Sequence, residues 1–153
     1  MWVLSMKRTL TALTVVATMF ASSASAFDPD DLQKLRKLQL KRCAGCDLSR
    51  VELIDADMSK AILHGANLTL AIMWGANLSK TDMSKAILIG AGLIRADLSG
   101  ADLSGADLKK ADLSGADLSG ADLSGANLAK AMMNGAILCN TIMPDGSVIY
   151  SGC

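Results

Sequence analysis

GADLSGADLKKADLSGADLSGADLSGANL, residues 100–128, repeats a five-residue unit in which Leu returns at every fifth position. In an α-helix five residues advance by about 500°, so successive Leu side chains would spiral around the axis. In a flat strand an odd spacing sends alternate side chains to opposite faces. The pattern therefore predicts a chain that turns after every repeat, so that all the Leu side chains face one interior.

The same register extends without a slip over residues 46–145 as twenty repeats. The central position holds fifteen Leu and five Met, and the position two residues earlier holds Ala in sixteen repeats. The four exceptions at that earlier position are Cys46, Val51, Thr81 and Thr141. Residues two apart share a strand face, so both positions are expected to point inward. The intervening Asp or Asn then points outward, and Ser-Gly or Ser-Lys forms the corner.

The tandem A(D/N)LSG unit resembles the pentapeptide-repeat family. The resemblance covers residues 46–145, about two-thirds of the chain, and implies an all-β fold, a right-handed quadrilateral β-helix. Four repeats per coil, as in that family, would give five coils. At about 4.8 Å between stacked strands, the rod would be ~24 Å long.

Residues 6–26, MKRTLTALTVVATMFASSASA, have the three parts of an export signal. Lys7 and Arg8 precede an apolar run over residues 9–20, and Ala24-Ser25-Ala26 matches a cleavage site. The run is too short to span a bilayer. We expect residues 1–26 to be a cleaved signal peptide and the mature chain to be periplasmic or secreted, without membrane attachment. A retained signal anchor is the alternative.

Both ends of a stacked β-helix need covering, because unpaired strand edges invite aggregation. Residues 27–45 include DPDDLQKLRKLQLKR, with Pro and Asp residues suited to a helix start and basic residues suited to its end. This segment predicts an N-terminal capping α-helix and linker, and the alternative is a basic stretch that binds a membrane or an acidic partner. Residues 146–153 predict a short C-terminal cap, with Asp145-Gly146 as a turn before a Val-Ile-Tyr strand.

The four Cys residues fall into two pairs, Cys43 with Cys46 and Cys139 with Cys153. A shared zinc site is excluded because Cys46 and Cys139 would lie ~19 Å apart along the rod. A redox-active Cys-x-x-Cys would need a thioredoxin-like context, which the sequence lacks. Export favours two structural disulfides, with the Cys139–Cys153 pair favoured over the closely spaced Cys43–Cys46 pair.

Composition gives no indication of catalysis. Hydrophobic residues make up 51% of the chain but aromatic residues only 3%, and the formal net charge is zero. The single His, His64, lies at an outward repeat position without an evident partner, and the filled core leaves no substrate pocket. We expect no enzyme activity, no cofactor, no metal site and no nucleic-acid partner.

Large apolar residues gather at outward positions of one part of the predicted rod. Ile54, Trp74 and Ile94 are spaced by twenty residues and would stack on successive coils. The remaining members, on the same face or its adjoining corner, are Leu70, Ile72, Ile87 and Ile89. A patch of several hundred Å² would suit a protein partner or a second copy. Cover by the N-terminal helix, or ordinary variation among repeats, is the alternative.

Acidic residues also form columns at the twenty-residue spacing, for example Asp82, Asp102 and Asp122. In some pentapeptide-repeat proteins such columns mimic DNA and bind type II topoisomerases. Basic residues interrupt the acidic field here, and an exported protein would not meet gyrase. The sequence therefore favours a non-catalytic exported interaction module with an unknown partner or self-association, with a DNA-mimic gyrase binder as the alternative.

Overall fold

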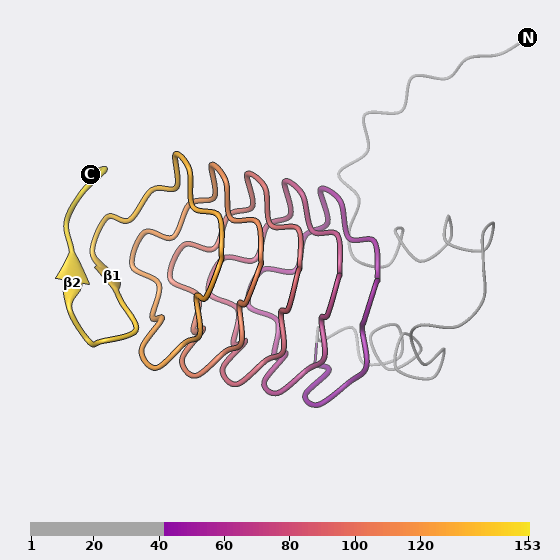
Figure 1. Cartoon of the computed structure of the whole chain (residues 1–153). Helices are drawn as coiled ribbons and strands as arrows, with labels where there is room; N and C mark the ends of the chain where they lie inside the picture. The colour runs from indigo at the N-terminus through magenta and orange to yellow at the C-terminus, as the bar shows by residue number, and fades with distance from the viewer. Residues whose placement is uncertain (1–41) are drawn as a thin grey trace, which may run out of the picture.

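The computed structural model describes residues 42–153 as one stack of coils (Figure 1). Parallel bridges join residues twenty apart, from Arg42 with Ile62 to Asp122 with Ile142. Each coil therefore takes twenty residues and four repeats, as the family resemblance implies. The predicted signal peptide and most of the predicted capping helix lie outside the described residues. Right-handedness remains a prediction from the family resemblance.

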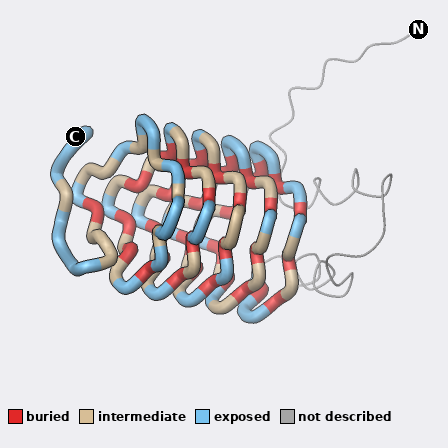
Figure 2. The backbone as a smooth tube through the Cα atoms, in the orientation of Figure 1, coloured by how far each residue is buried: buried red, intermediate tan, exposed pale blue. Residues whose placement is uncertain are grey.

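The interior is formed by the two inward positions of each repeat. Leu68 and Ala66 illustrate the pattern, since both side chains are fully buried and belong to one continuous apolar core. Figure 2 shows buried segments recurring along the sides of the coils, with exposed segments at the corners, and the last coil, from residue 127 on, is less buried. The prediction that Ala and Leu point inward is confirmed. Burial of each central side chain contributes about 2 kcal/mol before the loss of chain entropy is considered.

Backbone hydrogen bonds hold neighbouring coils together. The Leu68 N–H donates to the Ile87 carbonyl at 2.7 Å, and the Ile87 N–H donates to the Ala66 carbonyl at 2.9 Å. A third bond closes the corner within the coil, from the Ala71 N–H to the Leu68 carbonyl at 3.1 Å. Because each repeat bonds along the stack, the short extended segments act as a continuous ladder.

The last residue of every repeat except the twentieth adopts a left-handed backbone conformation, which explains the Gly often found there. Gly105 has φ of 65°. Where another residue takes this position the backbone does not change, as Leu70 and Lys110 show with φ of 58° and 60°. Left-handed φ costs a side-chain-bearing residue about 1–2 kcal/mol. The hydrogen-bond ladder therefore holds the non-Gly corner residues in a backbone conformation that they would not favour on their own.

The outward Asp or Asn of the repeat also has a structural task. The Asp97 Oδ1 accepts a hydrogen bond of 2.9 Å from the Ser99 N–H, and the Asn67 Oδ1 accepts one of 3.1 Å from the Thr69 N–H. This Asx geometry satisfies a backbone donor at the corner. The repeated Asp is therefore a turn-forming residue before it is a surface charge.

Two inward positions hold Thr in place of Ala. The Thr81 hydroxyl donates to the Met58 carbonyl at 3.0 Å, and the Thr141 hydroxyl donates to the Leu118 carbonyl at 2.7 Å. Both Thr residues are buried, and each bonds one coil back. A hydroxyl is tolerated in this apolar core because its donor is satisfied.

The two ends of the described chain differ. At the N-terminal end the ladder includes Arg42 and the core includes Cys43, so stacking extends into residues 42–45, within the range predicted as cap and linker. At the C-terminal end β1 (Thr141–Ile142) pairs antiparallel with β2 (Val148–Ile149), across a turn in which the Gly146 N–H donates to the Met143 carbonyl. β1 belongs to the last coil, through the Asp122–Ile142 bridge, and β2 lies beyond it at the end of the rod (Figure 1).

Candidate interaction surface

The seven predicted apolar residues lie on adjoining parts of the rod surface. Leu70 and Trp74 are the most exposed, at 48% and 46%, and Ile54 and Ile87 are also exposed. Ile72, Ile89 and Ile94 are half-buried. We call this set the Trp74 face, defined as Ile54, Leu70, Ile72, Trp74, Ile87, Ile89 and Ile94.

Coil stacking brings its members together. The Asp55 N–H bonds the Trp74 carbonyl at 2.9 Å, and the Gly75 N–H bonds the Ile94 carbonyl at 2.9 Å, which places Ile54, Trp74 and Ile94 on successive coils. The Leu70 N–H bonds the Ile89 carbonyl at 3.0 Å at the preceding corner. Ile72 lies on the side that joins these two corners. The twenty-residue register predicts this clustering.

The indole of Trp74 lies against Gly92 of the following coil. A Cβ placed on Gly92 would lie 2.5 Å from the indole Nε1 and 3.1 Å from Cδ1. Gly92 occupies the outward position that usually carries Asp, and it pairs with Ile72 in the ladder. The missing side chain therefore provides the space in which the indole rests.

A second close approach of the same kind occurs at the neighbouring corner. A Cβ on Gly90 would lie 2.9 Å from Leu70 Cδ2, so the Leu70 side chain leans over the following coil, as the indole does. Gly90 and Gly92 were not among the residues predicted to form this surface. The signal in the sequence was that Gly92 interrupts an outward column of larger residues, Glu52, Ile72, Asp112 and Met132, one coil after Trp74.

The acidic columns form as predicted, with Asp82, Asp102 and Asp122 joined by successive bridges. Their Oδ1 atoms accept hydrogen bonds from Ser84, Ser104 and Ser124 N–H groups at 2.8–3.0 Å. No group of three or more His, Cys, Asp or Glu side chains suited to a metal ion occurs within residues 42–153. These carboxylates are thus individually engaged in turns.

His64 has a partner that the sequence does not reveal. Its Nδ1 lies 2.7 Å from the Ser84 Oγ, and that hydroxyl lies 2.5 Å from the Asp82 Oδ1. With the Ser84 hydroxyl donating to the carboxylate, the imidazole donates to the hydroxyl. A nucleophilic serine needs the opposite order, in which an imidazole oriented by the carboxylate accepts the serine proton. The three side chains therefore form a surface hydrogen-bond chain.

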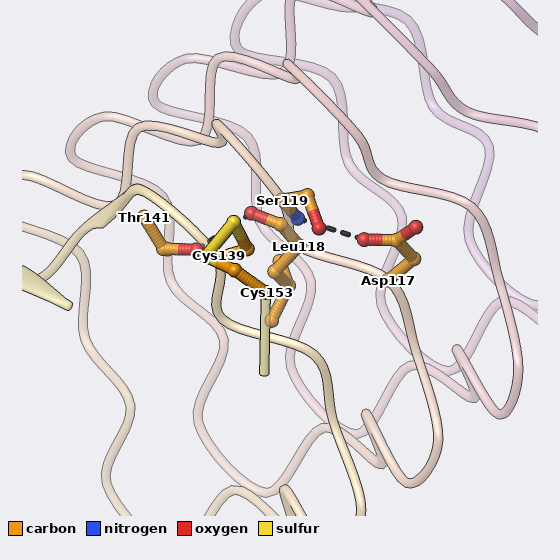
Figure 3. The surroundings of a disulfide bond; sticks show 6 residues. All are labelled: Asp117, Leu118, Ser119, Cys139, Thr141 and Cys153. Atoms are coloured by element: carbon orange, nitrogen blue, oxygen red, sulfur yellow. Dashed lines mark hydrogen bonds between the residues drawn. A yellow bond between two sulfur atoms is a disulfide. The ribbon is translucent and has the colours of Figure 1, made fainter. Parts of the chain in front are cut away.

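Both cysteine pairs lie at disulfide distance. The sulfur atoms of Cys43 and Cys46 are 1.97 Å apart, and those of Cys139 and Cys153 are 2.02 Å apart. The first pair is buried in the core at the N-terminal end of the described stack. Figure 3 shows the second pair beside Leu118 and Thr141, where it fastens the tail to the last coil.

The part of the chain that the structure describes, residues 42–153, contains no helix with the length and hydrophobicity needed to span a membrane.

Comparison with known proteins begins with a family model described as "Pentapeptide repeats", which matches residues 42–75, 73–105 and 106–143. The chain belongs to the pentapeptide-repeat family. Within this family it is similar to the pentapeptide repeat protein Rfr23 from the cyanobacterium Cyanothece 51142 at 30% identity and a TM-score of 0.54. That match covers 70% of this chain and 92% of Rfr23.

Two further solved pentapeptide-repeat structures are similar over comparable lengths. HetL from Nostoc sp. strain PCC 7120, involved in heterocyst differentiation regulation, is 34% identical over 71% of this chain and 64% of its own, with a TM-score of 0.35. QnrB1, a plasmid-mediated fluoroquinolone resistance protein, is 26% identical over 72% of this chain and 65% of its own, with a TM-score of 0.48. No curated protein matches the chain.

Proposed function

We propose that this pentapeptide-repeat protein is an exported, non-catalytic interaction module that binds a protein partner through the Trp74 face. The observation that carries this proposal is the half-exposed indole resting in the space left by Gly92. Aromatic side chains surrounded by smaller apolar groups contribute most of the binding energy at many protein interfaces. The flanking Ile54, Leu70 and Ile87 provide such a surround.

The stacked core supports binding through this face because it fixes the positions of the side chains. Ile72 and Trp74 flank the buried Met73, and their backbone groups are bonded to neighbouring coils at 2.7–2.9 Å. The Trp74 face would therefore lose little conformational freedom when a partner binds. Such preorganisation raises affinity for a given buried area.

Export is supported by the signal sequence over residues 6–26 and by the two cysteine pairs at disulfide distance. Disulfides persist in oxidising compartments such as the periplasm. Intact mass after alkylation of the natively expressed protein tests this part. A chain that begins at Phe27 with no alkylated Cys is expected, and a full-length cytoplasmic chain with four alkylated Cys would contradict export.

The acidic columns favour a second candidate, a DNA mimic that binds gyrase. Its support is the continuous run of Asp82, Asp102 and Asp122 along one side of the rod. A gyrase supercoiling assay at micromolar protein separates the two candidates. Inhibition that survives Trp74→Ser and disappears when these Asp residues are replaced by Asn would favour the DNA mimic.

The main test is a pull-down from the exported fraction with wild type, Trp74→Ser and Tyr150→Ser. Tyr150 is the matched control because it is an exposed aromatic residue outside the Trp74 face. We expect a protein retained by wild type and Tyr150→Ser to be lost with Trp74→Ser, while the melting temperatures stay similar. Equal retention by all three proteins would remove the Trp74 face as the binding site.

A further inference from the structure

Asn134 and Gly135, at a corner of the last coil, form the one Asn-Gly pair in the chain. Asn-Gly is the dipeptide most prone to lose the Asn amide group, because Gly has no side chain to hinder attack by its own backbone nitrogen. Both residues are exposed, and a Cβ placed on Gly135 would meet no atom within 4 Å. The Asn134 side chain and the nitrogen that follows it are therefore sterically accessible.

The backbone of Gly135 lacks the hydrogen bond that protects the equivalent nitrogen in the coil before it. There, the Gly115 N–H donates to the Asn134 carbonyl at 2.9 Å. The Gly135 N–H has no backbone acceptor within residues 42–153, because no further coil stacks on this corner. The Gly135 nitrogen can therefore react without first breaking a bond to a neighbouring coil.

The Asn134 side chain is also free of the contacts that hold other Asn side chains in place. It forms no hydrogen bond within residues 42–153. The Oδ1 atoms of Asn67, Asn77 and Asn127 each accept a hydrogen bond of 3.1 Å from the N–H two residues later. Each of those three is also followed by Leu, whose side chain hinders attack. Asn134 thus combines a free side chain with an unhindered and unbonded nitrogen.

We infer that Asn134 is a site of spontaneous deamidation, with solvent water as the co-reactant. The Gly135 nitrogen loses its proton and bonds to the Asn134 Cγ, the Cγ–Nδ2 bond breaks, and ammonia leaves. The product is a five-membered succinimide ring, which water opens at either carbonyl. Opening at Cγ gives an aspartate. Opening at the backbone carbonyl gives an isoaspartate, in which the main chain runs through Cγ.

The Asp145-Gly146 pair has related chemistry but is held by hydrogen bonds. The Asp145 Oδ1 accepts bonds from the Ser147 N–H at 2.9 Å and from the Ser147 hydroxyl at 2.6 Å. The Gly146 N–H donates to the Met143 carbonyl at 2.9 Å. Attack by this nitrogen would require both sets of bonds to break. The structure therefore favours one reactive pair at this end of the chain, at Asn134.

Deamidation changes the last coil in two ways. Either product adds a negative charge at position 134. Isoaspartate also lengthens the main chain by one carbon at the residue whose carbonyl accepts the Gly115 N–H. We expect this bond to weaken, so hydrogen exchange at Gly115 should be faster in modified chains.

Peptide mapping by mass spectrometry, after prolonged incubation of the oxidised chain in neutral buffer, tests this inference. Trypsin separates residues 111–130 from residues 131–153, and fragmentation then assigns each amide-to-acid conversion to Asn127, Asn134 or Asn140. We expect conversion at Asn134, with both aspartate and isoaspartate as products. Asn134→Gln should show none at this position, because its longer side chain would have to close a larger ring.

Ser114→Asn is the matched variant, because it places a second Asn-Gly pair at the same corner one coil earlier. There the Gly115 N–H is bonded to the Asn134 carbonyl. We expect the pair at position 114 to react about tenfold more slowly than the pair at position 134, because a backbone hydrogen bond must break first. Initial rates are compared within the same molecule, and circular dichroism checks that the variant folds.

Two results would overturn the inference. The first is an absence of conversion at Asn134, or faster conversion at Asn127 or Asn140. The second is equal initial rates at positions 114 and 134, since the dipeptide alone would then account for the reaction. The inference does not rest on the proposed function, because neither Asn134 nor Gly135 belongs to the Trp74 face.

Discussion

Trp74 and Gly92 are complementary, because the indole occupies the space that a side chain at position 92 would need. The repeat pattern calls for Asp or Asn at position 92, and Asp112 holds that position one coil later. The contact therefore depends on a local departure from the repeat. The relationship can be tested from either residue.

Gly92→Asp should expel the indole from its resting place without unfolding the rod. The new carboxylate matches the usual repeat residue, but its Cβ would overlap Nε1. In the exported chain that begins at Phe27, Trp74 is the sole tryptophan, and we expect a changed emission maximum and weaker partner binding. Ile62→Asp is the control, since it adds an outward Asp away from Trp74. Unchanged emission in Gly92→Asp would contradict the contact.

Lys110→Gly should raise the free energy of unfolding by about 1 kcal/mol, because Lys110 has left-handed φ that Gly adopts without strain. Lys109→Gly provides the comparison, since Lys109 is the neighbouring residue and is not among those with positive φ. That change should be neutral or destabilising. Urea unfolding of the two variants beside wild type measures the difference, and an equal effect of both would refute corner strain.

Thr81→Val should lower stability by about 1 kcal/mol, although it preserves shape and adds an apolar group to the core. The reason is the lost hydrogen bond from the Thr81 hydroxyl to the Met58 carbonyl. Ser79→Ala removes a hydroxyl that bonds the Asn77 side chain in a less buried place, so its cost should be smaller. Thermal unfolding ranks the two, and a stabilising Thr81→Val would show that burial outweighs the bond.

The C-terminal turn should loosen in acid. Hydrogen bonds from the Ser147 hydroxyl and N–H lower the pKa of Asp145 below its ordinary value of about 4. A group whose pKa is lowered by folding stabilises the fold above its unfolded pKa, and this contribution disappears as pH falls through the folded value. The Ser147 amide signal in NMR spectra should therefore shift below about pH 4. Asp145→Asn should remove that transition, and its persistence would assign the shift to another group.

Cys139→Ser with Cys153→Ser should free the tail and leave the rod folded. The disulfide closes the segment between residues 139 and 153, for which the expected stabilisation is about 3 kcal/mol. The Thr141 and Ile142 backbone remains bonded to the preceding coil, since the Ile142 N–H donates to the Ala121 carbonyl. Hydrogen exchange should accelerate at Val148 and Ile149 and stay slow at Leu118. Equal acceleration at Leu118 would show that the tail stabilises the whole stack.

The rod could be predicted well because its register depends on one number, the twenty residues per coil that the family resemblance implies for a five-residue repeat. A twenty-residue coil determines which side chains are buried, and it places Ile54, Trp74 and Ile94 in one column. The cysteine pairing was predicted on a different basis, from the grouping of the four Cys residues along the chain and from the expected export. Burial and column membership are properties of backbone position, which the residue number determines once the coil length is known.

The directions of the surface side chains could not be predicted from the sequence. Nothing in the repeat says that Trp74 lies across Gly92, or that Ser84 joins His64 to Asp82. Such contacts depend on rotamers chosen among neighbours on two coils. The path of the tail, over residues 137–142 of the last coil, was likewise not predicted, because it depends on how the chain turns after Met143.

The twenty-residue spacing of the bridges also limits how this chain can change in length. Duplication or loss of twenty residues adds or removes a layer and leaves every surface column intact. Insertion of a single five-residue unit keeps the core satisfied but turns everything downstream by a quarter. An insertion between Trp74 and Ile94 would thus split the Trp74 face without creating a cavity. The fold therefore tolerates insertions and deletions of five residues, whereas a binding surface that spans several coils is preserved only when the change is a multiple of twenty residues.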